Sequence, residues 1–223
     1  MKRRVVGIAL NALLRASIAA FLADTLLHPH DPRYEGKAIP LRNLVVVGSL
    51  SLTFPLLYLW QRQRRRLGSR PGWRRYPVWS DDLFLSIFWL DMAGNFFDLY
   101  DRYFHFDLIP HAHGSGALGA VLLNAFKMQP LAAFGVANGI HGLLEAQEIL
   151  TDVFCGTHNV RGAWDSIGDL GAGLIGTSAY IAVSYYLRNR LSAPSFSNGG
   201  EAASPLGDKS TRRLIFFYPK EYN

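Results

Sequence analysis

Cysteine is almost absent from this sequence: Cys155 is the only one among 223 residues. One thiol excludes an internal disulfide framework and a zinc site built from several cysteines. The compact zinc motif His-Glu-x-x-His is absent as well. The chain has no evident internal repeat, so it lacks the paired segments on which many alternating-access transporters are built. A metal site here would have to combine histidines with carboxylates.

Charged residues are also scarce, at 18% of the chain against 49% hydrophobic residues. Apolar runs of about 17–25 residues, long enough to cross a bilayer as a helix, alternate with polar connectors. We therefore predict an all-α bundle of about six transmembrane helices over residues 1–191. The remaining residues 192–223 are rich in Ser, Gly, Pro and Ala and are expected to form a mostly disordered cytoplasmic tail. The predicted spans are 5–27, 41–60, 82–100, 109–126, 130–150 and 165–187.

The first predicted span leaves an alternative open. Three basic residues precede its apolar run, and small residues at 20–23 are typical of a signal-peptide cleavage site. We favour a retained helix, because the apolar run is long and because Asn11 and Arg15 interrupt it.

The basic residues are distributed unevenly between the two sides of the predicted bundle. Seventeen lie on the side that holds both termini and five on the other, with Arg15 inside the first span. Cytoplasmic loops are enriched in Lys and Arg, so both termini are predicted to be cytoplasmic at the plasma or inner membrane, with Cys155 in an outer loop. The basic loop 61–75 is expected to contact anionic lipid headgroups. This explains the net charge of +6 without nucleic acid as a partner.

Polar residues inside the spans are the strongest functional signal. A charged side chain at the bilayer centre costs about 2.5–3.5 kcal/mol, so such residues normally face the bundle interior. Three spans carry them at helical spacing, which places the residues of each span on one helix face. The third, fifth and sixth spans hold, in order, Asp91, Asn95 and Asp98; His141, Glu145 and Glu148; and Asp165, Asp169, Gly173 and Gly176.

The depth of these residues predicts one shared cavity. At about 1.5 Å rise per residue, His141 lies near the midplane, while Glu145 and Asp169 lie nearer the outer surface. His111 and His113 begin the fourth span from the same side. All seven histidines are expected at the midplane or further out, so the polar faces should converge on a cavity open to the outer face.

Structural roles are the alternative explanation for these residues. Helix ends are naturally polar, and an acidic residue such as Asp165 stabilises the start of a helix. Arg15, also near the midplane, is expected to pair with Asp91 or Asp98, and that pairing would be no more than charge neutralisation. Three loop histidines are best explained as solvated: His28, His30 and His158.

Four motifs in the central stretch also carry a family resemblance. They are Asp91-Met-Ala-Gly-Asn95, Phe106-Asp107-Leu-Ile-Pro-His111, His141-Gly-Leu-Leu-Glu145 and Asp165-Ser-Ile-Gly-Asp169-Leu-Gly-Ala-Gly173. Together they resemble the YjdF-like inner-membrane proteins. The later motifs are similar to those of VanZ-like proteins, although Leu108 and Asp169 replace a lysine and an asparagine of that family. YjdF-like proteins have no established activity, and VanZ-like proteins are associated with glycopeptide resistance, so the resemblance implies a membrane fold and these residues, not a reaction.

Three functions are compatible with this pattern. We favour a divalent-metal-dependent site that acts on an envelope or lipid-linked molecule, because imidazole and carboxylate ligands suit Zn, Mn or Mg. A bound cation would also offset the repulsion between clustered carboxylates. The alternatives are a non-catalytic membrane partner held together by its polar ridges and a proton-coupled transporter. The predicted metal ligands are His111, His113, His141, Glu145 and Asp169; the catalytic candidates are Asp91, Asn95, Asp98, His141, Glu145, Glu148, Asp165 and Asp169.

Overall fold

The computed structural model describes residues 2–37, 39, 43–53, 55–56 and 76–192. Every regular element in these ranges is helical, which confirms the all-α prediction for this part of the chain. The bounds are α1 Lys2–Leu27, η1 Pro32–Tyr34, η2 Asn43–Val47, α4 Val78–Phe96, α5 Leu99–Arg102, α6 Leu108–Asn124, α7 Pro130–Cys155 and α8 Ala163–Ser192.

The described helices occupy the predicted span positions, but only two of them are long and apolar enough to cross a membrane by themselves. These two segments are Arg4–Leu27 and Ala163–Leu187. The second predicted span is represented by the shorter apolar helix Asn43–Thr53. The basic loop 61–75 and the predicted tail from 193 onward lie outside the described residues.

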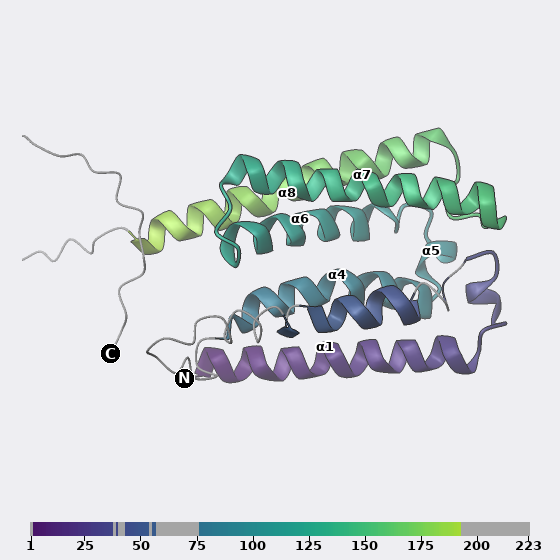
Figure 1. The fold of residues 1–223 in the computed structure, drawn as a ribbon, viewed down its shortest axis with the longest axis horizontal. Coiled ribbons are helices and arrows are strands. Elements are labelled where there is room, and N and C mark those ends of the chain that lie inside the picture. Colours follow the sequence, from purple (N-terminus) through teal and green to yellow (C-terminus); the bar gives the residue numbers. More distant parts are fainter. Residues whose placement is uncertain (1, 38, 40–42, 54, 57–75, 193–223) are drawn as a thin grey trace, which may run out of the picture. The chain divides into compact units, whose positions relative to one another are not determined.

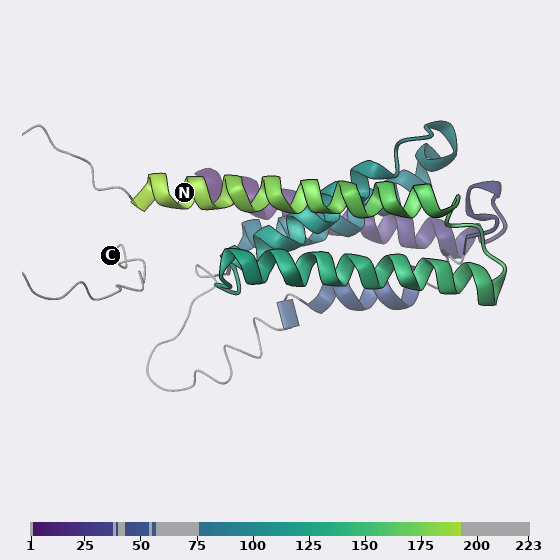
Figure 2. The same cartoon turned by 90° about the horizontal axis from the view of Figure 1, so that it is seen from above.

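The long helices pack side by side in the order α1, α4, α6 and α7, and α8 lies against α6 (Figures 1 and 2). The helix α6 is therefore the central one, and most of its residues are buried or half-buried. Its approach to α8 is very close, because a Cβ at Gly176 would overlap the backbone of Ala112. The missing side chain of Gly176 permits this close contact between the two helices.

The helix α7 has an inverted distribution of side chains. Its buried face carries small and polar residues, among them His141 and Glu145, whereas Leu131, Leu143 and Phe154 are 71–81% exposed. A surface helix of a water-soluble protein does the opposite, with its apolar stripe toward the core. This inversion brings the polar residues of α7 against α6 and α8.

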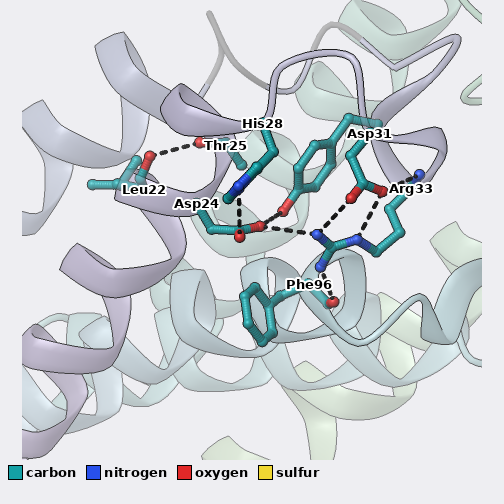
Figure 3. A network of polar contacts seen from close by, with 8 residues as sticks. Leu22, Asp24, Thr25, His28, Asp31, Arg33 and Phe96 are labelled. Atoms are coloured by element: carbon teal, nitrogen blue, oxygen red, sulfur yellow. Dashed lines mark hydrogen bonds and ion pairs between the residues drawn. The ribbon is translucent and has the colours of Figure 1, made fainter.

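A polar network joins the loop after α1 to the end of α4 (Figure 3). Arg33 donates hydrogen bonds to the Phe96 carbonyl oxygen at 2.7 Å, to Asp31 Oδ2 at 2.8 Å and to Asp24 Oδ2 at 3.2 Å. The hydrogen bonds from Arg33 hold the pKa of Asp31 at about 2. Arg33 is one of the five basic residues that the sequence predicts on the outer side, and in the structure it joins the end of α4 to Asp24 near the end of α1.

Asp152 organises the loop that follows α7. Its carboxylate accepts hydrogen bonds from Thr157 Oγ1 at 2.6 Å and from the backbone N–H groups of Asn159 and Val160 at 2.9 and 2.8 Å. The backbone N–H of His158 donates to the carbonyl oxygen of Gly36 at 3.0 Å. The loop before α8 is thus attached to the loop after α1.

Replacing Asp152 with alanine is expected to lower the free energy of unfolding at neutral pH but to have little effect near pH 2. Burial alone would raise the pKa of Asp152, but the hydrogen bonds from Thr157, Asn159 and Val160 outweigh it and hold the pKa at about 2. A folded-state pKa below the usual 3.8 means that the stabilisation is present above about pH 4 and is lost as the pH falls through about 2. Thermal unfolding of both proteins across this range measures the effect. A difference in melting temperature that does not shrink below about pH 4 would contradict it.

Candidate metal centre

Three helices bring a histidine and carboxylate cluster together. The first turn of α6 supplies His111, α7 supplies His141 and Glu145, and α8 supplies Asp169. His111 Nδ1 lies 2.8 Å from His141 Nε2 and 3.1 Å from Glu145 Oε1, and the last two atoms are 3.3 Å apart. His141 and Glu145 are one helical turn apart on the buried face of α7, as their spacing predicts.

The two ring nitrogens of His111 face different partners. While Nδ1 faces α7, Nε2 lies 3.4 Å from Asp107 Oδ1 and 3.9 Å from Asp169 Oδ1. Asp107 was not among the predicted site residues. Its spacing of four residues before His111, within the same quoted motif, is the signal that could have identified it.

The ionisable side chains of this cluster are buried, which is unfavourable in free energy unless their charges are compensated. His141, Glu145 and Asp169 are only 4–5% exposed. His141 Nδ1 and Asp169 Oδ1 have no hydrogen-bond partner among the described residues, and Glu145 Oε1 has the nitrogens of His111 and His141 beside it. Burying an ionised carboxylate without compensation is costly. The cluster therefore favours a bound cation or additional protons.

The first three donor atoms fit a small divalent ion. Zinc holds nitrogen and oxygen ligands at about 2.0–2.2 Å, which separates neighbouring ligand atoms in a tetrahedron by about 3.3 Å. The triangle formed by His111 Nδ1, His141 Nε2 and Glu145 Oε1 has sides of 2.8–3.3 Å. A point about 2 Å from all three atoms lies about 1 Å above their plane, so the spacing of the three donor atoms is compatible with zinc. Mg and Mn favour oxygen-rich octahedral sites and suit these two nitrogens less well.

Asp107 and Asp169 would then orient the histidine ligand. A metal-binding imidazole usually directs its other ring N–H to a carboxylate or a carbonyl group, which fixes the ring and increases its basicity. With Nδ1 of His111 on the metal, Nε2 faces these two carboxylates. Together with His111 they form a second group of three potential ligands in this region.

Gly173 of α8 determines how closely this helix approaches the cluster. A Cβ at this position would overlap the ring of His141 at Nδ1 and Cε1 and would lie 3.0 Å from Ser115 Oγ. The missing side chain therefore lets α8 close over His141. The sequence predicts close helix packing at this glycine, and the structure shows that His141 of the cluster is its neighbour.

His113 lies outside the cluster although the sequence predicted it as a ligand. Its Nε2 lies 2.8 Å from Ser86 Oγ of α4, and its Nδ1 lies 2.8 Å from the Tyr180 hydroxyl of α8. Residues two apart on a helix point about 200° apart. His111 therefore contacts α7 whereas His113 contacts α4, and both also reach residues of α8.

The predicted ridge of α4 makes local contacts of its own. Asp91 accepts a hydrogen bond from the Tyr100 hydroxyl at 2.9 Å, and Asn95 donates to the Asp91 carbonyl oxygen at 3.0 Å. Asp98 is not on this helix, because α4 ends at Phe96 and Asp98 has a left-handed φ of 60°. It pairs instead with Arg102 at 3.2 Å. The third predicted span therefore extended too far.

The prediction that Arg15 pairs with Asp91 or Asp98 is wrong. Arg15 Nη2 lies 2.7 Å from Asp81 Oδ2, near the start of α4. Helical side chains point toward the N-terminus of their helix, so the long arginine reaches the beginning of α4 rather than its middle.

The remaining two catalytic candidates are Asp165 and Glu148. Asp165, in the first turn of α8, accepts a hydrogen bond from the backbone N–H of Arg161 at 2.9 Å. Glu148 is half-buried on α7, three residues beyond Glu145. Neither belongs to the groups of potential metal ligands found among the described residues.

Comparison with known proteins adds no relative to this description. No protein-family model matches the sequence, and no curated protein or solved structure matches it.

Proposed function

We propose that this chain is a multi-pass integral membrane protein with about six spans and both termini in the cytoplasm. Two helices have the length and apolar composition to cross a membrane, and the exposed face of α7 supports more than two spans. Large apolar side chains cover that face while His141 and Glu145 are buried. Exposed apolar surface of this extent marks contact with a membrane or a partner. Lipid is the solvent that explains it, because polar residues in a bilayer turn inward.

Within this bundle, His111, His141 and Glu145 are proposed to bind one divalent cation, with zinc as the best fit. The observation that carries the proposal is the convergence of these three donor atoms within 2.8–3.3 Å in a buried site. Structural zinc sites are usually closed by four protein ligands, whereas catalytic sites keep one position for water or substrate. Three ligands therefore favour a metal-dependent reaction on an envelope or lipid-linked molecule.

The unpartnered atoms support this reading over a purely structural cluster. Polar ridges that only hold helices together would have their buried atoms satisfied by one another. Here His141 Nδ1 and Asp169 Oδ1 have no hydrogen-bond partner among the described residues, and Glu145 Oε1 is approached by the nitrogens of His111 and His141. A cation bound at Glu145, with Asp169 on the far side of the His111 ring, would offset the cost of burying both carboxylates.

Metal analysis of the detergent-purified full chain tests this proposal. We expect about one zinc ion per chain after purification in metal-supplemented buffer, with removal by a strong chelator and recovery on adding zinc. A chain that retains no zinc, and whose melting temperature does not change with zinc, manganese or magnesium, would overturn it.

The orientation is tested with the native thiol. Cys155 is exposed at the end of α7, and the basic asymmetry predicts that this end is outside. An impermeant thiol reagent is therefore expected to label Cys155 in intact spheroplasts, whereas a Cys155→Ser chain stays unlabelled. Labelling that requires permeabilisation would show that the orientation is reversed.

A further inference from the structure

We infer that Asp81 and Asp82, at the start of α4, form a second cation site that holds one monovalent positive charge, either a sodium ion or a proton. This pair is separate from the metal centre and does not depend on the function proposed for it. Asn11 of α1 joins the two carboxylates, since its Nδ2 donates to Asp81 Oδ2 and to Asp82 Oδ1 at 2.8 Å each. Both aspartates are buried, with 0% and 4% exposure.

Within the described part of the chain, the charges of this cluster do not balance. Arg15 is the partner of Asp81, at 2.7 Å, and arginine stays protonated in proteins. The other described contacts of the pair come from neutral groups, Asn11 and the Tyr76 hydroxyl. Two carboxylates and one guanidinium leave one negative charge, and an isolated buried charge is strongly unfavourable.

The donors are also shared unequally between the two carboxylates. Asp81 Oδ2 accepts hydrogen bonds from Asn11, Arg15 and Tyr76 within 2.7–2.8 Å. Asp82 accepts one, from Asn11. Asp81 is therefore stabilised as the carboxylate, and the excess charge belongs to Asp82.

Three buried oxygens at this cluster are available as ligands for a cation. Asp81 Oδ1 and Asp82 Oδ2 are buried and have no hydrogen-bond partner among the described residues. The Ser51 hydroxyl is a third such oxygen, and Ser51 lies beside the pair because its carbonyl oxygen accepts a hydrogen bond from Arg15 at 2.7 Å. Oxygen ligands without imidazole suit hard cations, and one positive charge neutralises the cluster, whereas a divalent ion beside Arg15 would overcharge it.

The test compares wild type with Asp82→Asn, in which an amide replaces a carboxyl group of nearly the same shape. If sodium fills the site, the melting temperature of the wild type should rise by about 2–4 °C between choline chloride and sodium chloride at equal ionic strength. Asp82→Asn should show no such rise. If a proton fills it, the infrared carbonyl band of a protonated carboxyl group should be present at pH 7 in wild type and absent in Asp82→Asn.

Two further variants make the result decisive. Asp101→Asn, which removes an exposed carboxylate paired with Lys37, should keep the sodium response and the infrared band of the wild type. Asp81→Asn, which breaks the pair with Arg15, should lower the melting temperature in either salt. Absence of both signals in wild type, or destabilisation by Asp82→Asn as large as that by Asp81→Asn, would show that Asp82 is an ionised structural partner and would overturn the inference.

Discussion

Replacing Glu145 with glutamine is expected to weaken zinc binding by at least about 100-fold, because the change removes a charged ligand from a site with only three. Residues that merely orient a metal ligand already contribute about 10–100-fold to affinity, and a direct ligand contributes more. The amide keeps the size of the side chain, so the fold should survive. Zinc content of the purified chain and competition with a chromophoric chelator measure the effect.

Two further variants distinguish a direct metal ligand from a residue that only orients one. Asp169→Asn should weaken zinc binding by about 10–100-fold, because Asp169 faces the far nitrogen of His111 rather than the proposed metal position. His158→Ala is the control and should bind zinc as the wild type does, since only its backbone is fixed, by Gly36. Equal zinc content in all four proteins would show that the cluster is structural.

The helices and part of the cluster were accessible from the sequence, because both follow from periodicity. Apolar runs located the helices, and the four-residue spacing of His141 and Glu145 placed both on one face of α7. The positive-inside pattern then placed Asp169 and His111 on the same side of the bundle. These four residues are the ones that the structure brings together.

The remaining features depend on helix rotation and on where each helix ends, which periodicity does not determine. His111 and His113 could not both face α7, and only the packing of α6 against three neighbours decides which one does. Asp98 left the predicted ridge because α4 ends two residues earlier. The Arg15 side chain is long and points toward the N-terminus of α1, so it pairs with Asp81 rather than with the residue at the depth of its own Cα.

Substitution of Gly173 is the second change with a large expected effect, and this effect comes from helix packing. Alanine at this position would place a methyl group on the ring of His141, so either α8 must move or His141 must leave Glu145. Overpacking of this kind costs about 1–3 kcal/mol. We expect Gly173→Ala to lower the melting temperature and to reduce zinc affinity by at least about tenfold, since the ligand triangle is disrupted.

Gly171, two residues earlier on α8, is the matched control. No neighbouring atom lies within 4 Å of the position that its Cβ would take, and alanine is favoured over glycine in a helix by about 1 kcal/mol. Gly171→Ala should therefore leave zinc affinity unchanged and should not lower stability. If Gly173→Ala lowers stability but keeps full zinc affinity, His141 is not a ligand, because a side chain displaced by a new methyl group cannot hold the metal as before. If Gly173→Ala behaves like Gly171→Ala in both measurements, the close approach of α8 to His141 is itself wrong.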